Sequence, residues 1–330
     1  MPMQRRLSTN TALIASALAA AGGMSWLAVN GVGWPAAVLV SLCGAIVLAG
    51  ILVLGSETRI EQLQKALIAK PARILIVIAT LWSVYFVYSM ATGTAQLQGL
   101  LVLAVYLSLP FLLLNHERTE SSWLDMIAIL WIWLPLEFGI LRHFLITTSA
   151  RGTDFHYGFA QALAINMGLI AFLAWRRFPG VGYRFEVDRR ILVAGVSSFV
   201  LFAAIAIPLG FAIGFITYSF EWRKLFVAPA TFLGIFLFIA IPEELLFRGL
   251  LQNWLERATS RHILSLILAS IVFGAAHLNN GAPIPNYRYF LMAAIAGLFY
   301  GVVWQRTRSL VAAGITHALV DAAWTVFFRA

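Results

Sequence analysis

The C-terminal third of this sequence carries ionisable residues inside long apolar stretches. The segment 241–249 reads Ile-Pro-Glu-Glu-Leu-Leu-Phe-Arg-Gly and contains Glu243, Glu244 and Arg248. Glu244 and Arg248 are four residues apart, so on a helix they face one another and can form an ion pair. Glu243 is turned about 100° from its neighbour and faces another part of the protein. The spacing predicts one glutamate held by an arginine and a second glutamate outside that pair.

Pro242 immediately precedes the two glutamates. Because proline has no N–H, the carbonyl group about four residues upstream loses its helical partner, and we expect the helix to be loosened beside the acids. A charged helix end at the membrane surface would be the simpler interpretation of this cluster. The long apolar run before Pro242 favours a position within the membrane instead.

Two further motifs place histidines on the apolar stretches that follow. Phe273 and His277 are four residues apart, and the Gly-Ala-Ala between them would let another helix approach closely. His317 and Asp321 have the same spacing, so Asp321 either orients His317 or faces a reacting group or a metal beside it. A single histidine in a membrane helix often serves only as a structural hydrogen-bond partner, so neither motif is specific alone.

Depth in the membrane links the three motifs. With a rise of 1.5 Å per residue, Glu243 and His277 each lie about 20 Å from the inner end of their apolar stretch. His317 and Asp321 lie at about 12 and 18 Å along theirs. Ionisable residues are costly inside a membrane and are usually functional there. Their agreement in depth predicts one shared site near the middle of the membrane.

The same residues could bind a metal ion. Two histidines and a carboxylate suffice for a catalytic zinc site with one open position, which makes Glu243, His277 and His317 candidate ligands. The His-Glu-x-x-His signature of many zinc peptidases is absent from the sequence. Spacing leaves both a zinc-assisted and a metal-free mechanism open, and zinc is the one cofactor that we consider.

The elements that must position these residues are transmembrane helices. Hydrophobic residues make up 61% of the chain and charged residues 11%, which excludes a soluble, disordered or coiled-coil protein. A bilayer core of about 30 Å needs about 20 mostly apolar residues per helix. Such stretches occur at about 11–29, 35–54, 74–90, 97–114, 123–145, 159–175, 190–216, 229–251, 263–280, 290–304 and 309–328. We expect an all-α polytopic transmembrane helical bundle of about eleven spans; the fifth is the weakest, because Asp125, Glu137 and Arg142 interrupt it.

The distribution of basic residues predicts the orientation of the chain. Most of the 23 lysines and arginines fall in alternate connections that we place inside, together with the N-terminus. The outer connections hold only Arg151, Arg223, Lys224, Arg288 and Arg329. Segment 176–190 is rich in arginine and is expected to contact anionic lipid head groups. This bias explains the net charge of +9 by contact with the lipid bilayer. We therefore expect the bilayer, and no nucleic acid, as a partner.

The three motifs together resemble the CPBP family of intramembrane proteases. Glu-Glu-x-x-x-Arg, Phe-x-x-x-His and His-x-x-x-Asn/Asp follow one another on separate apolar stretches, as they do in that family. The family contains the type II CAAX prenyl endopeptidases and bacterial abortive-infection or bacteriocin-immunity proteins. The resemblance covers residues 190–328, the protease-like core, whereas residues 1–180 form a region of about six helices without a recognised motif. It implies a multi-pass protein of the bacterial cytoplasmic membrane.

The resemblance also implies a role for each motif residue. Glu243 and His277 would activate water, while Glu244, Arg248 and Phe273 would support the site. His317 and the residue at 321 would hold the oxyanion of the intermediate. Asp321 departs from the asparagine version of the motif, and an ionised aspartate cannot donate a hydrogen bond to an oxyanion. It would have to be protonated, orient His317 or bind a metal.

These observations favour an intramembrane endopeptidase that cleaves a membrane protein or peptide, lipidated if the CAAX branch applies. A non-proteolytic member of the family, acting as an immunity or scaffold protein, is the first alternative. A proton-coupled transporter is the second, since membrane carboxylates and histidines also form proton relays. Transporters often contain paired repeats, and none is visible in this sequence.

Overall fold

The computed structural model describes the chain except for residues 1–4, 7–8, 30–31, 115–119, 146–152 and 330. Arg151, which we place in an outer connection, and Arg118, which falls in an inner one, lie outside the described residues. The chain divides into two compact units, residues 6–179 and residues 180–330 with residues 1–5. The described elements are almost entirely helical, which confirms the predicted all-α class.

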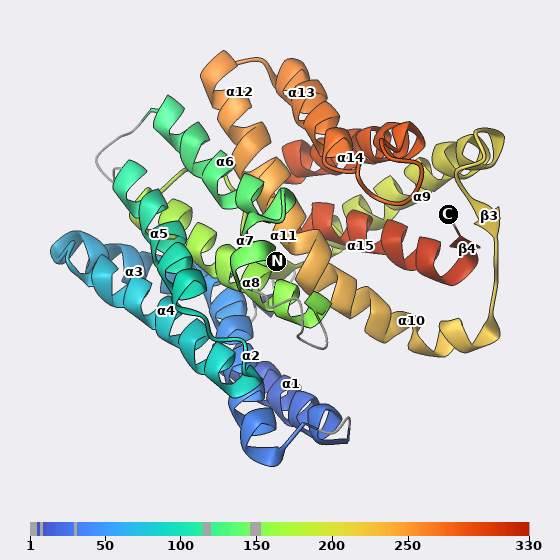
Figure 1. Cartoon of the computed structure of the whole chain (residues 1–330). Coiled ribbons are helices and arrows are strands. Elements are labelled where there is room, and N and C mark those ends of the chain that lie inside the picture. The colour runs from blue at the N-terminus through green and yellow to red at the C-terminus, as the bar shows by residue number, and fades with distance from the viewer. Residues whose placement is uncertain (1–4, 7–8, 30–31, 115–119, 146–152, 330) are drawn as a thin grey trace. The chain divides into compact units, whose positions relative to one another are not determined.

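The unit of residues 6–179 is built around α2. Its helices are α1 (Thr9–Val29), α2 (Trp34–Leu54), α3 (Glu57–Ala69), α4 (Arg73–Thr92), α5 (Leu97–Leu113), α6 (Trp123–Glu137), α7 (Ile140–Leu145) and α8 (Thr153–Leu169), and α8 continues as the π-helix η1 (Ile170–Trp175). The two-residue strand β1 (Arg5–Arg6) lies at the boundary of the units. Helix α2 packs against α1, α4 and α8 (Figure 1).

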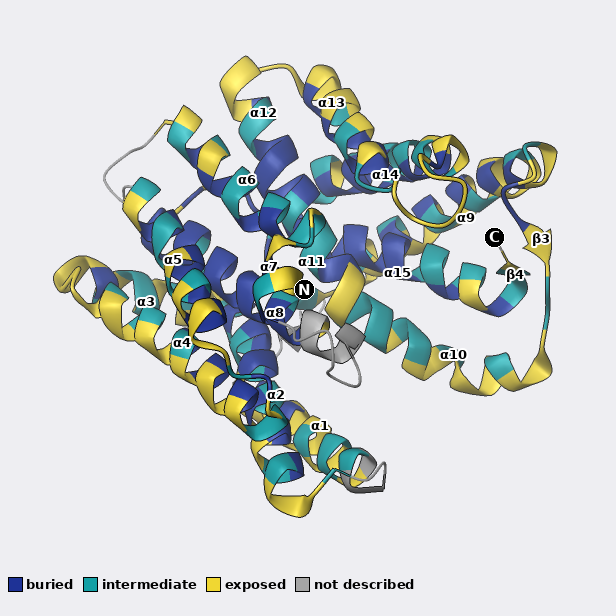
Figure 2. Ribbon diagram, viewed as in Figure 1, coloured by how far each residue is buried: buried dark blue, intermediate teal, exposed yellow. Residues whose placement is uncertain are grey.

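The unit of residues 180–330 is built around α15 (Leu310–Phe327). It contains β2 (Glu186–Val187), α9 (Arg189–Ala212), β3 (Thr217–Tyr218), α10 (Trp222–Ile235), η2 (Phe236–Ala240), α11 (Ile241–Glu244), η3 (Leu245–Gln252), α12 (Asn253–Thr259), α13 (His262–Ala275), α14 (Tyr287–Thr307) and β4 (Phe328–Arg329). Helix α15 packs against α9, α10 and α14, and β3 pairs antiparallel with β4. Figure 2 shows the contrast between the largely buried first half of α15 and α10, none of whose residues is buried.

Most of these helices fit the predicted spans. In the described residues, seven helical runs are long and apolar enough to cross a membrane, and α5 and α13 are shorter apolar helices. The single run 222–259 comprises α10, η2, α11, η3 and α12. Each of the eleven predicted stretches contains a helix, but a count of eleven membrane spans is not confirmed.

The structure corrects the predicted boundaries at two places. The stretch 123–145 is divided into α6 and α7, because Pro135 lies near the end of α6 and Gly139 adopts a positive φ of 66°. The stretch 263–280 ends earlier than predicted, since α13 stops at Ala275 and His277 lies in the turn that follows.

Polar N-cap residues begin the helices α9, α14 and α15. The Asp188 side chain accepts from the backbone N–H of Ile191 at the start of α9. Asn286 caps α14 and Ser309 caps α15 in the same way. Each cap satisfies a backbone donor that lacks a helical partner, and so fixes where the helix begins.

Candidate active site

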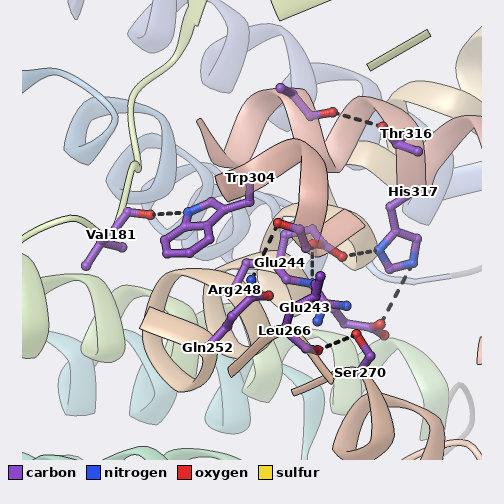
Figure 3. A network of polar contacts seen from close by, with 12 residues as sticks. Val181, Glu243, Glu244, Arg248, Gln252, Leu266, Ser270, Trp304, Thr316 and His317 are labelled. Atoms are coloured by element: carbon purple, nitrogen blue, oxygen red, sulfur yellow. Dashed lines mark hydrogen bonds and ion pairs between the residues drawn. The ribbon is translucent and has the colours of Figure 1, made fainter. Parts of the chain in front are cut away.

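The predicted ion pair between Glu244 and Arg248 is present (Figure 3). Arg248 Nε donates to Glu244 Oε2 over 3.0 Å, and both side chains are fully buried. The backbone on either side of Ile241–Glu244 is π-helical, in η2 before it and η3 after it. These wider turns agree with the loosening expected beside Pro242, and π-helical turns are frequent at functional sites.

His317 brings the first and third motifs together. Its Nδ1 lies 2.9 Å from the second oxygen of Glu244, Oε1, and because a carboxylate only accepts, Nδ1 is the donor. Its Nε2 lies 3.8 Å from Glu243 Oε2 and 3.4 Å from Asp321 Oδ2. Three carboxyl groups from two helical runs therefore surround one imidazole.

The two glutamates differ in accessibility. The Glu244 side chain is fully buried, whereas that of Glu243 is 33% exposed. The Asp321 side chain is 36% exposed, and His317 is almost completely enclosed. Glu244 is therefore held inside the protein by the predicted pair with Arg248, whereas part of the Glu243 side chain is exposed.

His277 joins this group from the turn after α13. Its Nδ1 lies 2.8 Å from the backbone oxygen of Phe273, which can only accept, so Nδ1 carries the proton. In the neutral imidazole the lone pair is then on Nε2. The Phe273 carbonyl thereby fixes the tautomer in which Nε2 can accept a proton.

Aromatic rings hold the imidazole and the guanidinium in place. Tyr300 of α14 stacks on His317, with 4.6 Å between ring centroids and 15° between planes. Phe273 contacts His317 edge-on at 5.9 Å. The Arg248 guanidinium lies 4.9 Å from the ring centroid of Phe273 and 5.9 Å from that of Tyr300, which places its charge over aromatic faces.

These side chains border a cavity of about 290 Å³ within the unit of residues 180–330. Its polar lining consists of Glu243, His277, Asn280, Tyr289, Tyr300, His317 and Asp321. Its apolar lining comes mainly from α9, α14 and α15. A cavity with a few converging polar groups in an apolar wall is typical of a small-molecule or peptide site.

The cavity includes side chains that the three motifs do not identify. Tyr289, Ala293, Ala296 and Tyr300 all line it from α14. Their spacing of four, three and four residues places them on one helix face. A search of that stretch for aromatic residues at helical spacing would have found both tyrosines.

The metal prediction has no geometric support. Among the described side chains, no group of three or more His, Cys, Asp and Glu is placed to hold a metal ion. Glu243, His277 and His317 border the cavity but do not form such a group.

The region that contains the candidate site matches one known family. Residues 225–323 match the family model described as Type II CAAX prenyl endopeptidase Rce1-like. The matched segment includes all three motifs, and the match confirms the family resemblance. No curated protein and no solved structure matches the chain.

Proposed function

Because residues 225–323 resemble type II CAAX prenyl endopeptidases, we propose that this protein is an intramembrane endopeptidase. It hydrolyses a peptide bond in a membrane-associated substrate, with water activated by Glu243 and His277. The observation that carries this proposal is the cavity shared by Glu243, His277, His317 and Asp321. The apolar helices of the chain make it an integral membrane protein.

Glu243 is the group best placed to take a proton from water. It is partly exposed to the cavity and does not share the buried position of Glu244. As the carboxylate takes the proton, the water oxygen attacks the carbonyl carbon of the peptide bond. The carbon–nitrogen bond then breaks, and the leaving amine receives a proton from Glu243 or through His277.

His277 and Glu244 serve this reaction in different ways. The lone pair on His277 Nε2 can accept a hydrogen bond from the attacking water and orient it. Glu244 keeps the His317 ring in position and balances the charge of Arg248. Positioned groups of this kind lower the barrier by holding reactants in a productive geometry.

The substrate class follows from the surroundings of the cavity. Its wall is largely apolar, and the helices around it are long enough to span a bilayer. These features suit a peptide segment that is embedded in the membrane or held there by a lipid. We propose a membrane protein or peptide as substrate and the lipid bilayer as environment, with no nucleic acid as partner.

Cleavage of membrane-tethered and CAAX-type reporter peptides tests this function. The wild-type protein in liposomes should cut at least one reporter, as detected by mass spectrometry of the products. Glu243→Gln and His277→Ala should each lower kcat/KM about 100- to 10,000-fold. Glu221→Gln is the matched control, because Glu221 is half exposed and pairs with Arg329 away from the cavity.

Three outcomes would change the assignment. Loss of cleavage on adding a zinc chelator would show that a metal assists the reaction. Solute flux driven by a pH gradient and abolished in Glu243→Gln would contradict the protease and support a transporter. Absence of cleavage, together with full biological activity of both site variants, would support a non-proteolytic immunity or scaffold protein.

A further inference from the structure

Hydrolysis of a peptide bond needs a hydrogen-bond donor for the oxygen that becomes negatively charged. The Nδ1 donors of the two site histidines are already used, by Phe273 O in His277 and by Glu244 in His317. The Nε2 atom of His317 faces the carboxyl groups of Glu243 and Asp321. The four residues predicted to be catalytic thus leave no donor that is committed to the substrate oxygen.

Tyr289 supplies a donor in the same cavity. Its ring centroid lies 5.0 Å from that of His277, the residue assigned to the attacking water. It also stacks on Trp324, with 5.9 Å between centroids and 18° between planes. This packing holds the phenol ring at the cavity wall, where the hydroxyl can turn its proton toward a bound group.

Asn280 can polarise that hydroxyl. Its side chain lines the same cavity and lies close enough to the Tyr289 side chain to exchange a hydrogen bond with it. When the Asn280 amide donates to the phenol oxygen, the phenol proton remains available for a second partner. A hydroxyl that accepts one hydrogen bond donates a stronger one, because bonds in a chain polarise each other.

Asn286 fixes both residues. Its amide nitrogen Nδ2 donates to Asn280 O over 2.9 Å, and its oxygen Oδ1 accepts from the Tyr289 backbone N–H over 3.0 Å. Its own backbone N–H donates to Leu278 O over 2.7 Å. This buried side chain therefore joins the turn after His277 to the first turn of α14.

We propose that Tyr289 is the oxyanion donor of this enzyme, and that Asn280 and Asn286 position it. The proposal rests on the endopeptidase function proposed above. It assigns to a phenol the donor role for which an ionised Asp321 has no proton. Tyr300 also lines the cavity, but it stacks flat on His317 as a support for the imidazole.

Kinetics of Tyr289→Phe test this assignment. The variant keeps the ring and loses only the hydroxyl, so kcat should fall about 100- to 1,000-fold with KM nearly unchanged. Tyr287→Phe is the matched control: Tyr287 lies on the same helix, is 70% exposed and does not line the cavity. It should cleave at the wild-type rate.

A second pair of variants carries Asp321→Asn and tests whether the effect of Tyr289→Phe comes from the lost hydrogen-bond donor. Asp321→Asn introduces an amide donor beside His317, so Tyr289→Phe should cost less than about tenfold in that background. An equal penalty in both backgrounds, a change confined to KM, or wild-type cleavage by Tyr289→Phe would each overturn the proposal. If the wild-type protein and Tyr289→Phe cleave at the same rate while Glu243→Gln and His277→Ala do not cleave, the endopeptidase function stands and the Tyr289 assignment falls. If the wild-type protein cleaves no reporter, both fall.

Discussion

Glu244 is the residue at which the charges of the site meet. One of its oxygens accepts from Arg248 and the other from His317, all three being almost completely buried. The ion pair with Arg248 follows from a spacing of four residues, and it was predicted. The bond to His317 joins residues 73 positions apart, a relation that spacing within one helix cannot reveal.

We predict that Glu244→Gln inactivates the site although Glu243 is intact. Glutamine has one acceptor oxygen in place of two, so either Arg248 Nε or His317 Nδ1 would face an amide N–H and lose its partner. An unsatisfied buried donor costs about 1–3 kcal/mol, which should lower the melting temperature and misplace His317. Thermal unfolding in detergent and reporter cleavage measure the two effects.

Glu221→Gln again serves as the control, since a half-exposed glutamate should lose little stability on this change. A Glu244→Gln protein with wild-type melting temperature and wild-type cleavage would contradict the role of Glu244. Loss of cleavage at unchanged stability would still agree with a positioning role.

Helices α13 and α14 show how small residues position the site. A Cβ atom at Gly274 would lie 2.7 Å from Phe290 O and 2.9 Å from Ala294 Cβ, so the two helices approach as closely as the sequence predicted. His277 follows one turn later, and Tyr289 and Tyr300 lie on the facing helix. The distance between α13 and α14 is therefore set by Gly274, which takes no part in the chemistry.

We predict that Gly274→Ala lowers both stability and activity. The added methyl group must push α14 away, at a cost of about 1–3 kcal/mol for an overpacked contact. The shift would separate Tyr289 from His277 and reduce kcat, as measured by reporter cleavage beside thermal unfolding. Gly234→Ala in α10 is the control, because its Cβ would have no neighbour within 4 Å. Equal melting temperatures and rates for both variants would contradict the close contact.

Hydrophobicity predicted where the helices lie better than it predicted the residues at which they end. A run of about 20 apolar residues has few alternatives to a helix in a bilayer, which explains the agreement of the predicted stretches. Helix α13 stops at Ala275, and in the turn that follows, the Asn286 side chain donates a hydrogen bond to Asn280 O. Such tertiary contacts leave no periodic signal in the sequence.

Each compact unit contains a buried ion pair formed by its own residues. In residues 6–179, Arg176 Nε donates to Asp125 Oδ1 over 2.8 Å, and both side chains are buried. Arg176 was expected among the arginines that contact lipid head groups, and this ion pair corrects that expectation. Asp125 also closes a capping box with Ser122 at the start of α6. Asp125 therefore has a structural role, whereas Glu243, His277, His317 and Asp321 line the cavity within residues 180–330.

The orientation of the chain gives a prediction about the whole molecule. Helix α9 has 24 residues and is about 36 Å long, more than the roughly 30 Å of a bilayer core, so its two ends should lie on opposite sides. From the arginines before α9, we predict that this end of the helix lies in the cytoplasm. With the buried Cys43 changed to alanine, single cysteines at the exposed positions Val187 and Tyr218 can be labelled with a membrane-impermeant maleimide. In sealed cells Tyr218→Cys should be labelled and Val187→Cys protected, and both should react after permeabilisation; the reverse pattern would place the N-terminus outside.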